Sequence, residues 1–147
     1  MQWRDRAFAE LTTAELHAIY ALRVRVFVVE QACAYQEIDE LDPRSRHVWA
    51  EADGRIVAYL RLIPAGAKYA ELGIGRVVTA PEARGVGLGR ELMQRGLALA
   101  GGAPLRIGAQ AYLERFYTEL GFVRASDVYD EDGIPHLEML RAPGARP

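Results

Sequence analysis

The chain has 147 residues, of which 50% are hydrophobic and 26% are charged. This length and balance predict one globular domain over residues 1–141, followed by a short tail at residues 142–147. The 18 basic and 20 acidic side chains give a net charge of −2, which excludes the strongly basic composition of proteins that bind nucleic acids or anionic membranes. The lone cysteine, Cys33, excludes an intrachain disulfide, and no Cys/His spacing indicates a metal site. We therefore expect a cytoplasmic protein without a signal segment or a membrane-spanning segment.

The first residues of the chain predict a strand followed by a helix. A short strand is expected at residues 7–11, and a capping box formed by Thr12 and Glu15 predicts that a helix begins there. Apolar side chains at spacings of three and four then place Arg23 on or beside the apolar face of that helix. The β-branched run at residues 26–29 either ends this helix or extends it.

An acidic segment and three strands are expected next. Seven acidic side chains against two arginines fall within residues 30–53, and such a run is typical of a solvated loop. The Asp-Gly pair at residues 53–54 joins two predicted strands, at residues 47–52 and 55–63, in a tight hairpin. A third strand is expected at residues 71–79, where interior glycines indicate a bulge or a close backbone approach.

The second half of the chain alternates helices with strands. A glycine-rich loop opens a helix that ends near residue 100 at a pair of glycines. The remaining expected elements are a strand at residues 105–109, a helix at residues 111–120, and a strand pair at residues 122–129 and 134–140. Hairpins in the first half and this alternation in the second predict a three-layer α+β or α/β domain, with a mixed central sheet flanked by helices.

The glycine-rich loop carries the clearest chemical signal. It consists of Arg84, Gly85, Val86, Gly87, Leu88, Gly89 and Arg90. Glycines at alternate positions before a helix let several backbone amides converge on one anion, and the helix dipole adds a partial positive charge there. The flanking arginines add charge-assisted donors. The alternative is that the glycines only form a tight turn, and the spacing excludes a P-loop because no Lys-Ser or Lys-Thr pair follows.

Arg84, Gly87 and Gly89 form an Arg-x-x-Gly-x-Gly pattern that resembles the pyrophosphate loop of the GNAT superfamily of N-acetyltransferases. Residues 105–110 and the Phe-Tyr-x-x-x-Gly-Phe pattern at residues 116–122 are similar to the fifth strand, fourth helix and signature of that superfamily. A further resemblance, to the ElaA-like subfamily, is carried by residues 23–31, Cys33, Tyr35, Asp39, Asp42 and residues 129–136. The resemblance covers most of the chain.

This resemblance implies a GNAT fold and direct transfer of an acetyl group from acetyl-CoA to an amine. It implies that backbone groups of Val77, Val78 and Thr79 bind the pantetheine and the thioester, and that the glycine loop binds the diphosphate. It assigns Tyr117 as the acid that protonates the departing thiolate, although aromatic side chains at helical spacing are also typical of a core. Gln110 stands at a CoA contact where many members carry asparagine.

For the general base and for the acceptor site, the resemblance indicates candidates rather than single residues. His136 and Glu71 are the candidate general bases. Arg23, Phe27 and Asp39 are the candidate acceptor-binding residues. The expected partner is a small-molecule or peptide amine, not a nucleic acid or a membrane, and family habit allows a homodimer.

Two other functions stay open at this point. One is a non-catalytic CoA-binding regulatory module on the same fold, and the other is an acyltransferase like the acyl-homoserine-lactone synthases, whose N-terminal pattern is similar. The charges also separate along the chain: residues 76–95 are basic, whereas residues 30–53 and 119–138 are acidic. If both acidic stretches line the acceptor mouth they favour a cationic amine; otherwise they are ordinary solvated loops.

Overall fold

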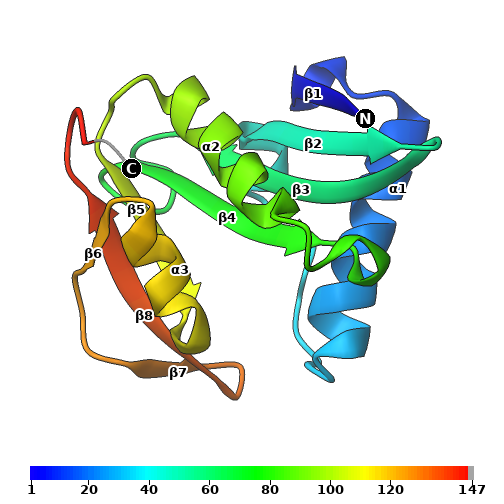
Figure 1. The fold of residues 1–147 in the computed structure, drawn as a ribbon. Helices are drawn as coiled ribbons and strands as arrows, with labels where there is room; N and C mark the ends of the chain where they lie inside the picture. Colours follow the sequence, from blue (N-terminus) through cyan, green and yellow to red (C-terminus); the bar gives the residue numbers. More distant parts are fainter. Residues whose placement is uncertain (146–147) are drawn as a thin grey trace.

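A computed structural model describes residues 1–145. The strands are β1 (Gln2–Ala7), β2 (Arg46–Ala52), β3 (Arg55–Ile63), β4 (Leu72–Thr79), β5 (Leu105–Gln110), β6 (Phe122–Arg124), β7 (Tyr129–Glu131) and β8 (Ile134–Arg141). The helices are α1 (Thr13–Arg23), α2 (Leu88–Ala100) and α3 (Glu114–Glu119). Within the described residues, the strands form one eight-stranded sheet in the order β1-β2-β3-β4-β5-β8-β6, and β7 pairs with β8 (Figure 1).

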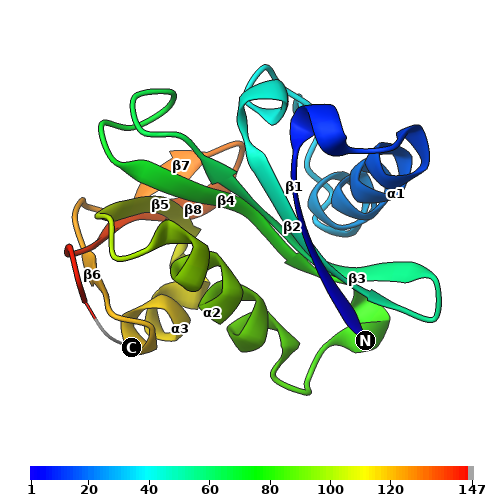
Figure 2. The same ribbon diagram turned by 90° about the horizontal axis from the view of Figure 1, so that it is seen from above.

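Helices cover both faces of this sheet, with α1 on one face and α2 and α3 on the other (Figure 2). Ile19 of α1 packs with Trp49 and Tyr59 in one apolar cluster, whereas Leu60 packs with Leu92 of α2 in a larger cluster. Neighbouring residues of β3 reach opposite clusters because successive strand side chains point to opposite faces. The predicted mixed sheet between two helical layers is confirmed.

The helix α1 begins as predicted and continues beyond its regular part. Thr12 Oγ1 accepts from Glu15 N at 3.0 Å, and Glu15 Oε1 accepts from Thr12 N at 2.9 Å. The β-branched run extends the helix rather than ending it, in wider π-helical turns through residues 24–30. The bond from Gln31 N to Val26 O, 3.0 Å long, has the five-residue spacing of that geometry.

The first strand differs from the prediction. β1 ends at Ala7, the first residue of the expected strand at residues 7–11, and residues 8–10 form a 3-10 turn instead. β1 is an edge strand paired with β2 alone, and its charged residues Arg4, Asp5 and Arg6 are only partly buried. An edge strand of this kind has no apolar alternation, so the hydrophobic pattern does not reveal it.

The sheet splits between β4 and β5. These parallel strands pair only at Leu72 with Leu105 and at Gly73 with Arg106, and they diverge beyond that point. A bulge lies in the same part of β4, because Tyr59 opposes Val78 whereas Arg61 opposes Gly75. Arg76 lies within it at a φ of +51°, in the left-handed region, so the predicted bulge is present. The two halves of the sheet therefore separate in a V (Figure 1).

The C-terminal part is more broken than the sequence predicts. A 3-10 turn at residues 111–113 precedes the short α3, and the expected strand at residues 122–129 is divided into β6 and β7. In the tail, Gly144 N donates to Gly102 O at 2.9 Å, while Arg146 and Pro147 lie outside the described residues. No helix in residues 1–145 has the length and apolar character needed to cross a bilayer.

Candidate active site

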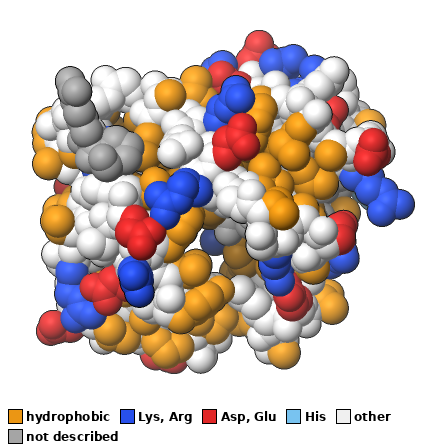
Figure 3. All heavy atoms as spheres, in the orientation of Figure 1, with side chains coloured by type: hydrophobic (Ala, Val, Ile, Leu, Met, Phe, Trp, Pro, Cys, Tyr) orange, Lys and Arg blue, Asp and Glu red, His pale blue; other side chains and the backbone are white. Residues whose placement is uncertain are grey.

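The split in the sheet opens into a cavity of about 860 Å³. One wall comes from β3, β4 and the helical segment that follows α1, and the other comes from β5, β8 and α3. Figure 3 shows the molecular surface hollowed near its centre, where the two halves diverge, with apolar side chains along the border. An elongated cofactor arm and an acceptor therefore have room to meet between the two halves.

The structure brings many of the predicted site residues to this cavity. Those that line it are Phe27, Val77, Val78, Thr79, Arg84, Gly89, Gln110, Tyr117 and His136. Those outside its lining are Arg23, Asp39, Glu71, Gly85, Val86, Gly87, Leu88 and Arg90. Most of the second set belongs to the glycine loop, which lies at the outer rim beside α2. The others, Arg23, Asp39 and Glu71, form ion pairs with other side chains of the chain.

The glycine loop has the geometry of an anion cradle. Gly85 and Gly87 have φ values of +85° and +80°, and no heavy atom lies within 4 Å of the place where either residue would carry a Cβ. Val86 between them is 80% exposed, while the buried Leu88 anchors the start of α2 in the core. This open backbone at the N-terminus of a thirteen-residue helix fits a diphosphate.

The arginines beside the loop are engaged in ion pairs. Arg84 Nη1 and Nη2 each donate to a carboxylate oxygen of Glu30 at 2.7 Å, and Arg84 Nε donates to Thr79 O at 3.2 Å. The hydrogen bond from Arg84 lowers the pKa of Glu30. Arg90 pairs with Glu119 in the same exposed manner. The arginines that flank the loop are thus neutralised by carboxylates of the same chain.

Tyr117 of α3 is held rigidly at the cavity. Its side chain is 5% exposed, and its ring packs edge-on against Phe116 and Phe122 with centroids 5.1 and 5.9 Å away. Burial raises the pKa of its hydroxyl, so the group keeps its proton at neutral pH. Tyr117 therefore belongs to the hydrophobic core and also lines the cavity.

The two candidate bases have different surroundings. His136 lines the cavity, its Nδ1 lies 2.7 Å from Ile134 O, and its Nε2 lies 3.5 Å from Glu131 Oε2. The carbonyl contact requires a proton on Nδ1, so Nε2 is the ring nitrogen that can accept a proton when the ring is neutral. Glu71 lies outside the cavity lining, and hydrogen bonds from Arg106 at 3.0 and 3.2 Å lower its pKa. Of the two candidates, only His136 faces the cavity.

The acidic segment after α1 is not the solvated loop that the sequence predicts. Asp42 and Arg23 are both 0% exposed, and Arg23 donates to Asp42 Oδ1 at 2.7 Å and to Glu37 Oε2 at 2.7 Å. Although burial opposes its charge, the hydrogen bonds to Asp42 keep the pKa of Arg23 raised. Arg23 therefore has no free surface for an acceptor, and it fixes the segment that follows α1 instead.

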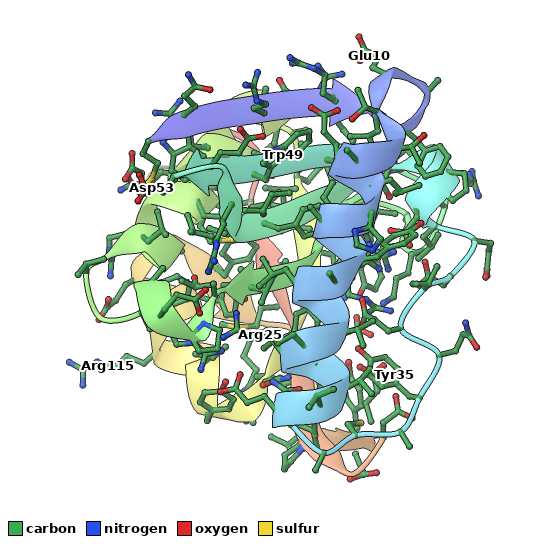
Figure 4. All side chains as sticks on the ribbon, turned by 90° about the vertical axis from the view of Figure 1, so that its right-hand side faces the viewer. Glu10, Arg25, Tyr35, Trp49, Asp53 and Arg115 are labelled. Atoms are coloured by element: carbon green, nitrogen blue, oxygen red, sulfur yellow. The ribbon has the colours of Figure 1, made fainter. Side chains whose placement is uncertain are left out.

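Two further arginines complete this buried network. Arg61 donates to Asp39 at 2.7 Å and to Asp42 at 3.0 Å, and Arg76 donates to Glu37 at 2.8 Å. Asp39 is thus committed to the network rather than to the cavity. Tyr35, whose hydroxyl donates to Glu37, lies on the loop that runs beside α1 in Figure 4 and also lines the cavity.

Sequence reasoning missed Arg61 and Arg76 as cavity residues. Arg61 is the one charged side chain in the otherwise apolar stretch at residues 56–63, and that position was the available signal. Arg76 follows the interior glycines of β4, where a bulge was expected, and its positive φ turns it toward the loop. The sequence did not indicate that both would meet carboxylates from one acidic segment.

A mixed sheet that splits beside a glycine loop, with a cavity in the split, is the architecture of acyl-CoA-dependent acyltransferases of the GNAT class. A family model described as an acetyltransferase (GNAT) domain matches residues 12–142. The chain belongs to this family.

The relatives place it within an ElaA-like group, as predicted. ElaA of Escherichia coli is 38% identical over 147 residues, with 96% of each chain covered, and its crystal structure matches with a TM-score of 0.90. A crystal structure of an acyl-CoA N-acyltransferase from Pseudomonas aeruginosa matches with a TM-score of 0.92 and 45% identity, covering 96% of this chain and 99% of that one. A UPF0039 protein of Schizosaccharomyces pombe is 44% identical over 138 residues, with 90% and 91% coverage.

Proposed function

We propose that this protein is a cytoplasmic N-acetyltransferase that moves the acetyl group of acetyl-CoA to a primary amine by direct attack. The observation that carries the proposal is the open glycine loop at the N-terminus of α2, next to a cavity that Tyr117 lines. The amides of Gly85 and Gly87 bind the diphosphate, and the free edge of β4 at residues 77–79 binds the pantetheine arm.

The residues divide the chemistry between them. Acetyl-CoA supplies an activated acyl carbon and a thiolate leaving group. A backbone amide of β4 near Val78 stabilises the negative charge that develops on the acyl oxygen, because the strand is unpaired toward β5 there. Tyr117 donates its proton to the sulfur, and His136 Nε2 accepts the proton that the attacking amine loses.

Tyr117 is tested by removal of its hydroxyl alone. We expect Tyr117→Phe to lower kcat by about a hundredfold, the typical size of a general-acid contribution, with little change in the Kd for CoA. The ring packing survives in this variant, so the unfolding midpoint changes little. Tyr112→Phe is the matched control, because Tyr112 lies on the cavity rim but is exposed. An unchanged kcat in Tyr117→Phe removes this residue from the mechanism.

The base is tested by the pH dependence of kcat/KM. We expect His136→Gln to abolish the acidic limb of the profile, because His136 faces the cavity with Nε2 as an acceptor. Glu71→Gln should keep that limb, because Glu71 is ionised by its pair with Arg106 and lies outside the cavity lining. If both variants keep the wild-type acidic limb, neither residue is the base.

The activity itself is tested by acetyl-CoA consumption over a panel of small amines, amino-acid amides, polyamines and peptides. Acetylation of any amine that depends on Tyr117 supports the proposal. Binding of CoA without transfer to any amine supports the regulatory module instead. Formation of a lactone from S-adenosylmethionine and an acyl carrier protein supports the acyl-homoserine-lactone alternative. Elution volume during the same purification reports whether the expected homodimer forms.

A further inference from the structure

The cavity wall contains a buried cation with one unused donor. Arg61 of β3 lines the cavity and is 1% exposed. Its Nη1 and Nη2 donate to the carboxylates of Asp39 and Asp42 at 2.7 to 3.0 Å. Its Nε is buried and has no hydrogen-bond partner in the part of the chain that the structure describes. A buried donor without an acceptor is unfavourable, so this position favours a ligand that supplies an oxygen.

Gly75 of β4 leaves the approach to that donor open. The strand register places Gly75 opposite Arg61, and Gly75 also lines the cavity. A Cβ built on Gly75 would lie 3.8 Å from Arg61 Nε and 3.5 Å from Ile63 Cδ1, both ordinary van der Waals distances. A side chain at this position would therefore fit the fold but would place a methyl group between the buried donor and the cavity.

The charge balance around Arg61 favours an uncharged oxygen. The buried network contains three guanidinium groups and three carboxylates, and these charges cancel (3 − 3 = 0). Its members are Arg23, Arg61, Arg76, Glu37, Asp39 and Asp42. Of the described lysines and arginines that line the cavity, only Lys68 and Arg84 lie outside this network, and Arg84 is paired with Glu30. A ligand carboxylate would add a negative charge beside Asp39 and Asp42, whereas a carbonyl oxygen accepts the Nε proton without adding charge.

The opposite rim of the cavity favours the charged amine of the same ligand. Glu131 and Asp132, in the β7–β8 hairpin, both line the cavity. Glu138 of β8 lines it as well and shares Arg106 with Glu71. A protonated amine is attracted to this acidic rim before it loses its proton. Within the described residues, the two sides of the cavity therefore offer acidic side chains on one rim and a single unpartnered donor on the other.

We propose that Arg61 Nε binds a carbonyl oxygen of the acyl acceptor, and that the acceptor is therefore an amine joined to an amide or peptide group. This rests on the proposed function, because it takes β4 near Val77 as the place where the amine reacts. Gly75 precedes Val77 by two residues across the bulge at Arg76, so the carbonyl lies at most about 7 Å along β4 from the reacting amine, at roughly 3.3 Å per residue of extended strand. The first two residues of a peptide N-terminus span such a distance.

The kinetic test compares two acceptors of similar length, dialanine amide and hexylamine, in the enzyme with Gly75→Ala. We expect kcat/KM for dialanine amide to fall about tenfold or more, the effect of losing a hydrogen bond to a charged group, while that for hexylamine stays within twofold. Gly108→Ala is the matched control, because it adds the same methyl group to the facing wall, next to Tyr69 Oη and not Arg61. It should affect both acceptors alike.

Three kinetic outcomes overturn the proposal. One is an equal fall for both acceptors in Gly75→Ala, which indicates lost volume alone. Another is the same selectivity change in Gly108→Ala. The third is a preference for dialanine as the free acid over its amide, which assigns a carboxylate to the site in place of an uncharged carbonyl.

A second measurement does not need turnover. With CoA added to saturation, the Arg61 Nε–H resonance of ¹⁵N-labelled protein is followed, assigned by its absence in Arg61→Lys. We expect acetyl-dialanine amide to shift this resonance and N-hexylacetamide to leave it in place, because the two share the acetamide group but only the first carries further carbonyls. No shift with either compound overturns the proposal. Calorimetric CoA binding reports separately on the proposed function.

Discussion

Two sets of arginine–carboxylate pairs border the cavity, and they differ in burial. In the buried network after α1, Arg23 and Asp42 have side chains that are both 0% exposed and share two hydrogen bonds. Beside the glycine loop, Arg84 and Glu30 also form a bidentate pair, but their side chains are 43% and 41% exposed. Both are bidentate arginine–carboxylate pairs, but the first lies in a poorly solvated interior and the second lies in contact with water.

This difference in burial gives the two sets of ion pairs different roles. A buried pair is fixed, because removing one partner leaves a charge without compensation in a poorly solvated site. An exposed pair is weak, since water and salt screen it and either partner is readily exchanged for another ion. The buried network therefore fixes one wall of the cavity, while the pairs at the glycine loop are open to exchange with other ions.

The largest expected effect comes from opening the buried network. Asp42 accepts hydrogen bonds from both Arg23 and Arg61, so Asp42→Asn removes the negative charge that compensates two buried guanidinium groups. We expect the free energy of unfolding to fall by about 3–5 kcal/mol, measured by urea denaturation. Glu82→Gln is the control, because its pair with Arg25 is about half exposed on both sides.

The control should leave the urea midpoint nearly unchanged. Equal destabilisation by Asp42→Asn and Glu82→Gln would contradict the distinction between the two sets of pairs. A loss in Asp42→Asn that vanishes in high salt would contradict it as well, because buried pairs are screened far less than exposed ones.

The fold was predictable where local chemistry determines it. The capping box at Thr12 and the Asp-Gly turn at residues 53–54 act within a few residues, and both lie where the sequence predicts. The gap between β6 and β7 was not predictable, because it depends on which segment of β8 each strand pairs with. Pairing between strands that are distant in the sequence produces no local pattern of residues from which it could be predicted.

The site divides in the same way. The glycine loop is contiguous, so its residue types alone indicate an anion cradle. The network under the cavity joins Arg23, Arg61 and Arg76 from separate elements to one acidic segment, and a sequence shows the charges without showing their pairing. The sequence therefore assigned Asp39 and Arg23 to the acceptor site. In the fold, Asp39 pairs with Arg61 and Arg23 pairs with Glu37.

A smaller effect is expected at the glycine loop. Gly87 and Gly101 have φ values of +80° and +62°, and a Cβ would meet no atom within 4 Å at either position. Alanine should therefore destabilise the fold similarly at both, by about 1–2 kcal/mol, through left-handed strain alone. Only Gly87→Ala should weaken CoA binding, by roughly tenfold in calorimetry, because only this residue lies in the proposed cradle. Equal CoA affinities in the two variants would count against the loop as the diphosphate site.

The smallest effect is expected from the exposed pair itself. If Arg84 leaves Glu30 to bind a diphosphate, Glu30→Gln removes a competitor and should raise CoA affinity about two- to fivefold, the range of a surface ion pair. Glu82→Gln makes the same substitution in an exposed pair outside the loop, and it should leave the CoA affinity unchanged. Because Arg84 lowers the pKa of Glu30, the wild-type pair persists at neutral pH and is lost only as the pH falls through that lowered value. The advantage of Glu30→Gln should therefore narrow in acid, and an advantage that does not change with pH would mean that Arg84 never exchanges its partner.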